Sequence, residues 1–222
     1  MSTLKHSPAI WLLVMILAGC ANSQPVAYRG LDLAPQLGPN SNDDDEHIPF
    51  HYAANDADWN RYTEIVLDPV VVYGSPDHQF GELPQEDRVE LAAYMGEQFA
   101  EALKTKYTLT GTPSPRALRV HLTLTGAEAS TPVVSTLTKV TPVTLVINVV
   151  QTVRDKPGPF SGTVSYAVEL YDSTSNRPLR AYVTKQYPWA ENIAASFGTL
   201  DASKAGIRNG AELLLAQLAD RR

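Results

Sequence analysis

Apolar and polar residues alternate along several segments of the chain, and a period of two predicts strands that bury one face. Residues 119–125 alternate strictly, with Val120, Leu122 and Leu124 on one face and His121 on the other, beside Thr123. Residues 164–170 and 179–183 also alternate. We expect them to form a hairpin, because the sequence Asp-Ser-Thr-Ser-Asn between them favours a turn.

A β-branched run over residues 65–73 predicts a further strand, interrupted at Asp68-Pro69 because proline cannot donate a ladder hydrogen bond. The residues that follow, Gly74 to Asp77, favour a turn.

Two segments show the helical period instead. Residues 84–107 and 201–218 are predicted to be helices, and Glu86 and Asp87 in the first turn of the former complement the helix dipole. The predicted apolar stripe of the first is Val89, Ala92, Ala93, Gly96, Phe99, Ala100, Leu103 and Tyr107, and that of the second is Ile207, Ala211, Leu214 and Leu218.

Residues 142–153 are the most apolar part of the chain after the N-terminal twenty residues, and their pattern supports two structures. Their β-branched density favours a strand. Thr141 as N-cap, Pro142 at the first helical position and Pro157-Gly158 as a stop favour a helix, which we expect. The segment is either plain core or an exposed contact patch for a partner or the membrane surface; the patch residues would be Val143, Val146, Val149 and Val150.

The order of these elements predicts an α+β fold: a single compact domain over residues 59–222, with a small antiparallel or mixed sheet packed by two or three helices. A composition of 44% hydrophobic and 19% charged residues is sufficient for a core. Residues 20–58, rich in Pro, Gly, Asn and Asp, are predicted to be a flexible acidic tether that Leu31, Leu33 and Phe50 pin in places.

The first 19 residues have the features of a cleaved signal peptide. Lys5 and His6 precede an apolar run over residues 9–18, which is too short to span a bilayer. The sequence Leu17-Ala18-Gly19-Cys20 resembles the lipobox of bacterial lipoproteins. This resemblance implies cleavage before Cys20 and attachment of fatty acyl chains, such as palmitate, to that cysteine.

Membrane attachment through two or more acyl chains would be stable. Cys20 is the only cysteine, so the domain would contain no internal disulfide. Ala21 stands where inner-membrane lipoproteins of this kind often carry an aspartate. We therefore expect anchoring at the outer membrane, with the domain facing the periplasm.

Several motifs together resemble one family of bacterial lipoproteins, the domain of unknown function 3313. They are Asp58-Trp59 with Tyr62, the run from Val66 to Tyr73, Gly162 to Ser165, and Glu169 to Thr174. Members usually have glycine in the hairpin turn, where this chain has Ser175-Asn176. The resemblance implies residence in the cell envelope and assigns no catalytic residue.

Charge and motifs exclude several classes of function. The formal net charge of −6 becomes −7 once residues 1–19, with Lys5 as their only charge, are removed. Without a Lys/Arg cluster, the chain has no electrostatic footprint for nucleic acid. It also lacks a Gly-x-Ser-x-Gly elbow and a phosphate-binding glycine loop. We expect no cofactor.

Candidate chemistry is sparse. His47 and His51 lie four residues apart beside an acidic run, but Pro49 separates them and a solvated linker explains them better than a metal site. Glu169 and Asp172 are the only carboxylate pair near a hairpin end, and the turn itself explains Asp172.

We therefore expect a non-enzymatic binding or accessory module, held on the membrane by its N-terminal lipid and contacting another envelope protein. The alternative is a cell-envelope hydrolase or transferase that uses convergent carboxylates.

Overall fold

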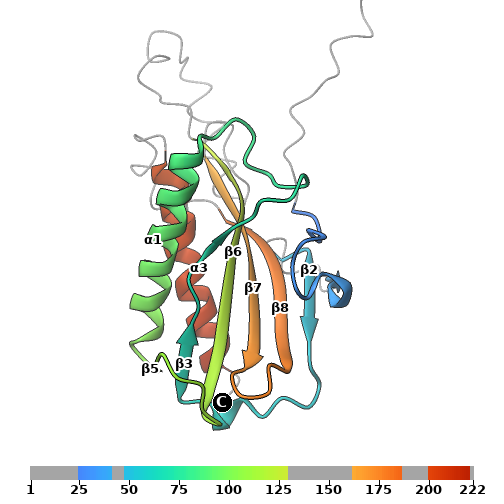
Figure 1. Cartoon of the computed structure of the whole chain (residues 1–222), viewed down its shortest axis with the longest axis vertical. Coiled ribbons are helices and arrows are strands. Elements are labelled where there is room, and N and C mark those ends of the chain that lie inside the picture. The colour runs from blue at the N-terminus through green and yellow to red at the C-terminus, as the bar shows by residue number, and fades with distance from the viewer. Residues whose placement is uncertain (1–24, 42–47, 130–161, 187–199, 221–222) are drawn as a thin grey trace, which may run out of the picture.

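The computed structural model describes residues 25–41, 48–129, 162–186 and 200–220 (Figure 1). The helices are η2 (Ala34–Gln36), η3 (Trp59–Arg61), α1 (Gln85–Leu103) and α3 (Asp201–Ala219). The strands are β1 (Gly38–Pro39), β2 (Phe50–Ala53), β3 (Glu64–Leu67), β4 (Val71–Val72), β5 (Thr108–Leu109), β6 (Ala117–Glu128), β7 (Thr163–Asp172) and β8 (Pro178–Gln186).

In the described residues these strands form one mixed sheet, in the order β1-β2-β8-β7-β6-β3-β5, with β4 also paired to β6. The strands β6, β7, β8 and β2 are antiparallel neighbours, whereas β3, β4 and β5 join the sheet by parallel pairing. The predicted α+β class, with a mixed sheet in one compact domain, is confirmed. So is the hairpin, which β7 and β8 form.

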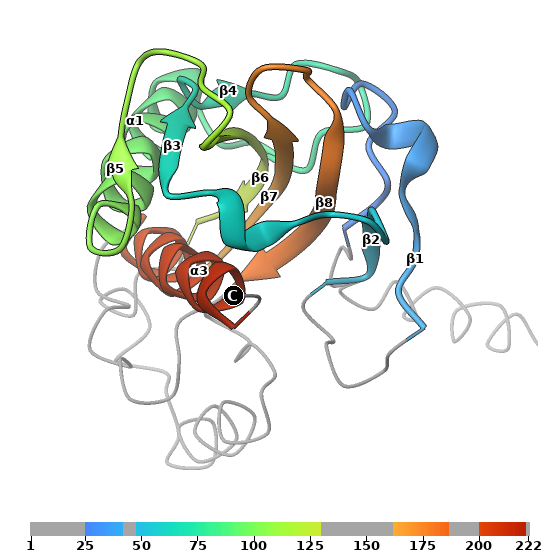
Figure 2. The ribbon, with the colours of Figure 1, turned by 90° about the horizontal axis from the view of Figure 1, so that it is seen from below.

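Helices α1 and α3 lie side by side against one face of the sheet (Figures 1 and 2). The main core fills this interface, where Val120, Leu122 and Leu124 of β6 are fully buried, as predicted. The α3 stripe of Ile207, Ala211, Leu214 and Leu218 is also buried, as predicted. One face of the sheet therefore carries most of the apolar packing that stabilises the domain.

The predicted break at Asp68-Pro69 divides the segment that runs beside β6 into two strands, β3 and β4. Leu67 pairs with Val120 and Val71 with Thr123, so three residues of this segment lie opposite two residues of β6. This extra residue is a bulge, which redirects the side chains next to it. Asp68 points from the bulge toward β6, where its carboxylate meets Arg119.

The prediction for α1 was wrong about which side is buried. Val89 is 54% exposed and Ala93 is also exposed, whereas Leu91 and Met95 are fully buried. Both stripes have helical spacing and share Ala92, Phe99 and Leu103. The structure selects the stripe with the longer side chains because burial of Leu and Met removes more apolar surface from water than burial of Val and Ala. The helix also ends at Leu103, before the predicted 107.

The hairpin turn compensates for its missing glycine. Asn176 adopts φ +53°, the left-handed conformation that glycine adopts most readily and that asparagine tolerates better than most residues. The carboxylate of Asp172 accepts hydrogen bonds from the backbone N–H groups of Thr174 and Ser175. The turn role predicted for Asp172 is confirmed.

The N-terminal segment, which we define as residues 28–37, packs on the sheet face opposite α1 and α3. Tyr28, Leu31 and Leu33 are buried, and Tyr28 and Leu31 form a second apolar cluster with Tyr73, Ala167 and Val183. The prediction of a flexible tether up to residue 58 is therefore corrected: residues 28–37 pack on the domain, and β2 joins the sheet beside β8. The pinning role predicted for Leu31 and Leu33 is confirmed.

Among the described residues, no helix combines the length and apolar character needed to cross a membrane. The segment 142–153, with its candidate contact patch, lies outside the described residues. So do residues 1–19, which are predicted to be a signal peptide, and Cys20.

Two glycines of α3 permit its close approach to the sheet. A Cβ atom on Gly206 would lie 2.9 Å from a methyl carbon of Val164. A Cβ atom on Gly210 would overlap the hydroxyl group of Tyr166, whose ring is buried between α3 and α1 and makes an edge contact with Phe99. Glycine at these positions is a packing requirement.

We expect Gly210→Ala to lower the free energy of unfolding by about 1 to 3 kcal/mol, because Tyr166 must move in a closely packed core. The control is Gly96→Ala in α1, where the nearest atom to a new Cβ is a methyl carbon of Val70 at 3.5 Å. That change should raise the stability by up to about 1 kcal/mol through helix propensity. Urea unfolding of both variants measures the difference, and equal effects would contradict the packing argument.

Candidate functional site

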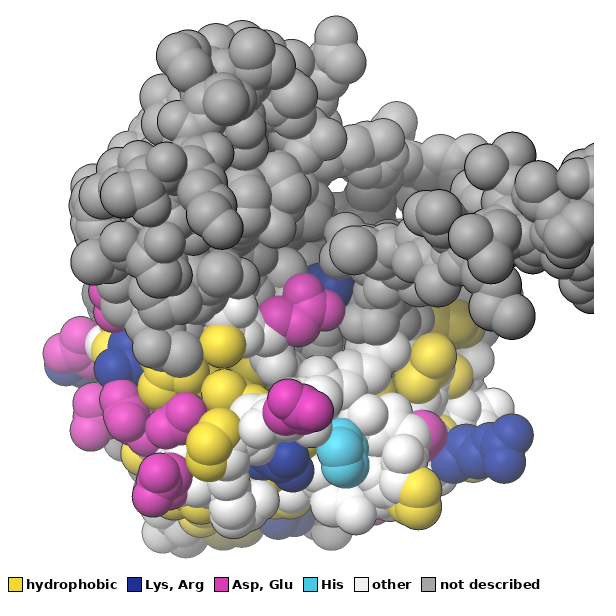
Figure 3. Space-filling view, turned by 90° about the horizontal axis from the view of Figure 1, so that it is seen from above, with side chains coloured by type: hydrophobic (Ala, Val, Ile, Leu, Met, Phe, Trp, Pro, Cys, Tyr) yellow, Lys and Arg dark blue, Asp and Glu magenta, His cyan; other side chains and the backbone are white. Residues whose placement is uncertain are grey.

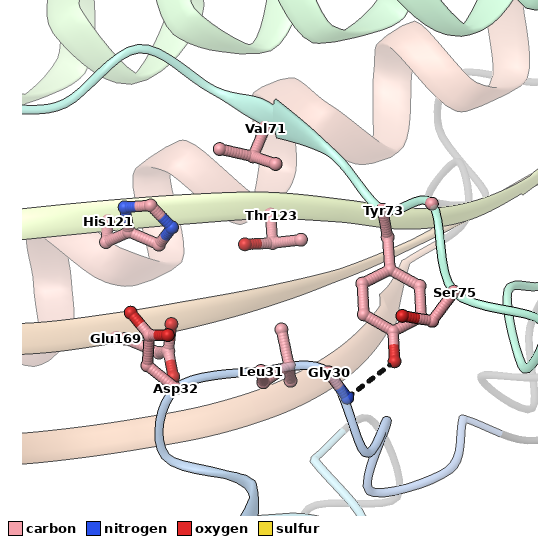
Figure 4. Close-up of a pocket in the computed structure, with 10 residues that line it drawn as sticks. Gly30, Leu31, Asp32, Val71, Tyr73, Ser75, His121, Thr123 and Glu169 are labelled. Carbon is pink, nitrogen blue, oxygen red and sulfur yellow. Dashed lines mark hydrogen bonds between the residues drawn. The ribbon is translucent and has the colours of Figure 1, made fainter.

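A cavity of about 360 Å³ lies between the N-terminal segment and the sheet, on the face opposite α1 and α3 (Figure 4). Three parts of the chain that are distant in sequence form its walls. They are the N-terminal segment, β4 with the turn after it, and the centres of β6 and β7. The lining residues are Gly30, Leu31, Asp32, Val71, Tyr73, Gly74, Ser75, His121, Thr123 and Glu169.

Strand alternation places the polar side chains at the cavity. His121 and Thr123 alternate with the core residues of β6, and Glu169 alternates with those of β7, so all three point away from the α-helices. His121 and Glu169 are direct cross-strand partners. The prediction that His121 and Thr123 share the polar face of a strand is confirmed.

Much of this polar face is covered in the folded protein. Thr123 is 4% and Glu169 is 2% exposed, because the N-terminal segment and β4 cover them.

Side chains of the domain hold the N-terminal segment by its backbone. The N–H of Leu33 donates to Glu169 Oε1 at 2.7 Å, that of Gly30 to the Tyr73 hydroxyl at 2.8 Å, and that of Arg29 to Asp77 Oδ2 at 3.0 Å. The Tyr73 hydroxyl in turn donates to Asp77 Oδ1 at 2.8 Å. The segment is thereby fixed as one wall of the cavity.

Glu169 is a carboxyl group in an unfavourable electrostatic environment. Burial raises its pKa, and the nearby carboxylate of Asp32 raises it further. The Leu33 N–H and His121 act in the opposite direction without reversing the shift. Keeping a charge here costs stability, and such shifted groups concentrate at functional sites.

His121 borders the cavity and contacts a second carboxylate. Its Nδ1 lies 3.4 Å from Asp68 Oδ2, which also accepts a hydrogen bond from Arg119 Nε at 2.8 Å. The bulge at Asp68 therefore supplies a counter-charge beside the histidine. Glu169, His121, Asp68 and Arg119 form a polar row across the sheet face.

The predicted carboxylate pair does not converge. Glu169 points into the cavity, but Asp172 is three residues further along the same strand and lies on the α-helix side, where it accepts a hydrogen bond from the Tyr62 hydroxyl at 2.9 Å and pairs with Arg61. The acidic residue that does lie near Glu169 in the cavity is Asp32. The sequence indicated no such role for Asp32, because its segment was expected to be a tether.

Metal ligands are not grouped in the parts of the chain that the structure describes, where no set of three His, Cys, Asp or Glu side chains is placed to hold an ion. His51 lies in β2, and His47 lies outside the described residues together with the acidic run beside it. Leu17, Ala18, Gly19 and Cys20 also lie outside them, as do Val143, Val146, Val149 and Val150.

The remaining residues that sequence reasoning missed are Tyr73 and Ser75. Both lie in or next to the predicted turn after β4, which the parallel pairing of β4 with β6 carries to the cavity. Only the pairing reveals this position.

On the face shown in Figure 3, acidic and basic side chains are interspersed among hydrophobic and uncharged ones in the described part of the surface.

Comparison with known proteins gives a family match and remote structural likenesses. The family model described as "Protein of unknown function (DUF3313)" matches residues 29–214. A variant of the PelC dodecamer from Paraburkholderia phytofirmans is 10% identical with a TM-score of 0.38, covering 72% of this chain and 89% of that chain. The hypothetical protein CT253 from Chlamydia trachomatis is 9% identical with a TM-score of 0.36, covering 71% and 98%.

At these identities and TM-scores, neither structure bears on the function of this chain. No curated protein matches the chain.

We expect Glu169→Gln to stabilise the folded protein at neutral pH, because an amide oxygen can still accept the Leu33 N–H bond and no charge is buried. A carboxyl group whose pKa is raised on folding binds more protons in the folded state, so stability falls as pH rises above its ordinary value of 4.5. The advantage of the variant should therefore be small below that pH and grow above it.

Thermal unfolding between pH 4 and pH 8 measures this difference. The control Glu101→Gln removes an exposed carboxylate of α1, which is 3.4 Å from Lys104, and should change stability little at any pH. A variant less stable than the natural protein at pH 7 would show that Glu169 serves structure alone.

Proposed function

Because this chain belongs to the DUF3313 family of proteins of unknown function, we propose its role from its own cavity: a non-enzymatic binding module of the bacterial envelope, anchored by lipid on Cys20. The anchor would lie in the outer membrane, with the domain in the periplasm. The observation that carries the proposal is the cavity between the N-terminal segment and the sheet.

The form of the cavity supports binding. Its volume of about 360 Å³ lies within the range of small-ligand sites, roughly 300 to 1,000 Å³. Its polar groups, from Ser75, His121, Thr123 and Glu169, converge from separate elements on one space. Convergence of a few placed polar groups in a concave site is what ligand recognition requires.

The carboxylate pair predicted for hydrolysis or transfer, Glu169 with Asp172, lies on opposite faces of the sheet. The carboxylates that do come together are Glu169 and Asp32 in the cavity, and we propose binding for them because Glu169 accepts the Leu33 N–H and so also holds the cavity wall in place. Asp172 is occupied by the hairpin turn, Tyr62 and Arg61. The contact with another envelope protein through residues 142–153 stays a prediction, since that segment is outside the described residues.

The anchor would hold the cavity close to the membrane. Five residue steps separate Cys20 from Pro25, the first described residue, and can extend over at most about 18 Å. Pro25 is buried and leads directly into the N-terminal segment. A lipid on Cys20 would therefore restrict the domain to the headgroup region and the water next to it. A flexible tether of residues 20–58 would allow the domain to lie much farther from the membrane.

The anchor is tested by Cys20→Ala. We expect loss of the acyl mass on mass spectrometry and accumulation of the uncleaved precursor, because the lipobox cysteine is the attachment point. Natural protein that begins elsewhere, or that carries an unmodified thiol at Cys20, would overturn the anchor.

The binding role is tested by a photo-crosslinking amino acid at Val71, which lines the cavity and is 44% exposed. The matched control is Val89, an exposed valine of α1 on the opposite side of the sheet. In intact cells we expect a discrete adduct from position 71 and none from position 89.

A second substitution shows whether that adduct depends on the cavity. Gly74 lines it and has open space where a Cβ atom would lie, so Gly74→Trp should block access and reduce the adduct. Gly111 has similar space outside the cavity, so Gly111→Trp should not. Equal labelling from positions 71 and 89, or none from either, would count against the binding role.

A further inference from the structure

The charge of the cavity lining is one-sided. Two carboxylates, those of Asp32 and Glu169, lie in it, and the described lining residues include no lysine or arginine. Figure 4 shows the two carboxylates close together, on the side of the cavity across from Val71. Arg119, which lies on the same face of the sheet, is paired with Asp68 outside the lining. The field in the cavity therefore favours a positively charged group.

The carboxylate of Glu169 is buried next to the cavity. Glu169 is 2% exposed and yet lines the cavity, so its carboxylate has little access to bulk water. The backbone N–H of Leu33 donates to Oε1, and the hydroxyl group of Tyr171 acts on the same carboxylate; both are neutral groups. A buried carboxylate that receives only neutral donors and has a second carboxylate nearby lacks a full counter-charge, which a bound cation would provide.

We propose that the cavity binds a primary ammonium group, with Glu169 and Asp32 as its carboxylate partners and the hydroxyl group of Thr123 as a further acceptor. This inference rests on the binding function proposed above and names the class of its ligand. An ammonium group has three donors, which suit carboxylate and hydroxyl acceptors converging from several sides.

Two sources can provide this group, and they share its chemistry. One is the headgroup of an ethanolamine phospholipid, which the short link from Cys20 to Pro25 would bring within reach of the cavity. The other is a free diamine in the surrounding water. The ligand in the first case is part of the membrane surface and in the second case is a soluble molecule.

The test uses the natural lipidated protein, purified in detergent. Titration with putrescine, and separately with ethanolamine, should raise the melting temperature in proportion to occupancy. Reconstitution into nanodiscs of mixed ethanolamine and choline phospholipids, compared with choline phospholipid alone, tests the headgroup, because choline has no N–H donor. Protection of the Leu33 and Gly30 amides from hydrogen exchange reports occupancy of the cavity in both arms.

Glu169→Gln should weaken amine binding at least about tenfold, since a charge-assisted hydrogen bond contributes more than a neutral one. Asp32→Asn should weaken it to a smaller extent because Asp32 is exposed to water. The control Glu101→Gln removes the same charge from α1, on the other side of the sheet, and should leave affinity unchanged. Glu169→Gln keeps the shape of the side chain, so a folded variant is expected.

The outcomes separate this inference from the binding function. Binding of an amine in either arm that depends on Glu169 supports the inference. If no amine binds, or if Glu101→Gln weakens binding as much as Glu169→Gln, the inference is wrong. In that case an adduct from position 71 would leave the binding function standing, and its absence would remove both.

Discussion

Three backbone N–H groups of the N-terminal segment, those of Arg29, Gly30 and Leu33, donate to side chains of the domain. This attachment creates the cavity, because the sheet face beneath it would otherwise be an open polar surface. It also buries Glu169, whose carboxylate both holds the segment and lines the cavity. Fold and site thus depend on the same hydrogen bonds.

The two faces of the sheet serve different purposes. On one face, α1 and α3 pack an apolar core, and the glycines of α3 allow the helix to lie close to β7. That face supplies most of the burial that stabilises the domain. The other face has the small apolar cluster around Tyr28 and the polar row through His121. The apolar packing is thus concentrated on one face, and the cavity lies on the other.

Glu169 and Asp172 show how position on one strand places two carboxylates in different environments. Asp172 receives backbone donors from its turn, a tyrosine hydroxyl and a guanidinium group, which together stabilise its charge. Glu169 receives a single backbone donor and lies near Asp32. A residue that costs stability in the free protein, and would be stabilised by a ligand, is typical of a site where function opposes stability.

The local pattern of apolar residues was sufficient to predict the elements that have a single clear apolar face. The alternation of Val120, Leu122 and Leu124 predicted β6, and the spacing of Ile207 and Leu214 predicted α3, because period alone determines which side chains share a face. Pattern was insufficient for α1, where two stripes of helical spacing overlap and only packing against the sheet selects Leu91 and Met95 over Val89 and Ala93.

The sequence by itself determined the α+β class, the hairpin, its turn at Asp172 and the polar face that carries His121 and Thr123, since each follows from contacts among near neighbours in the chain. Only the tertiary structure decided that residues 28–37 cover that face and that Asp32 meets Glu169 there. The two parts of the chain are joined by a hydrogen bond from the backbone N–H of Leu33 to the side-chain carboxylate of Glu169, 136 positions apart, and by burial of Leu31. Neither leaves a periodic signal in the sequence.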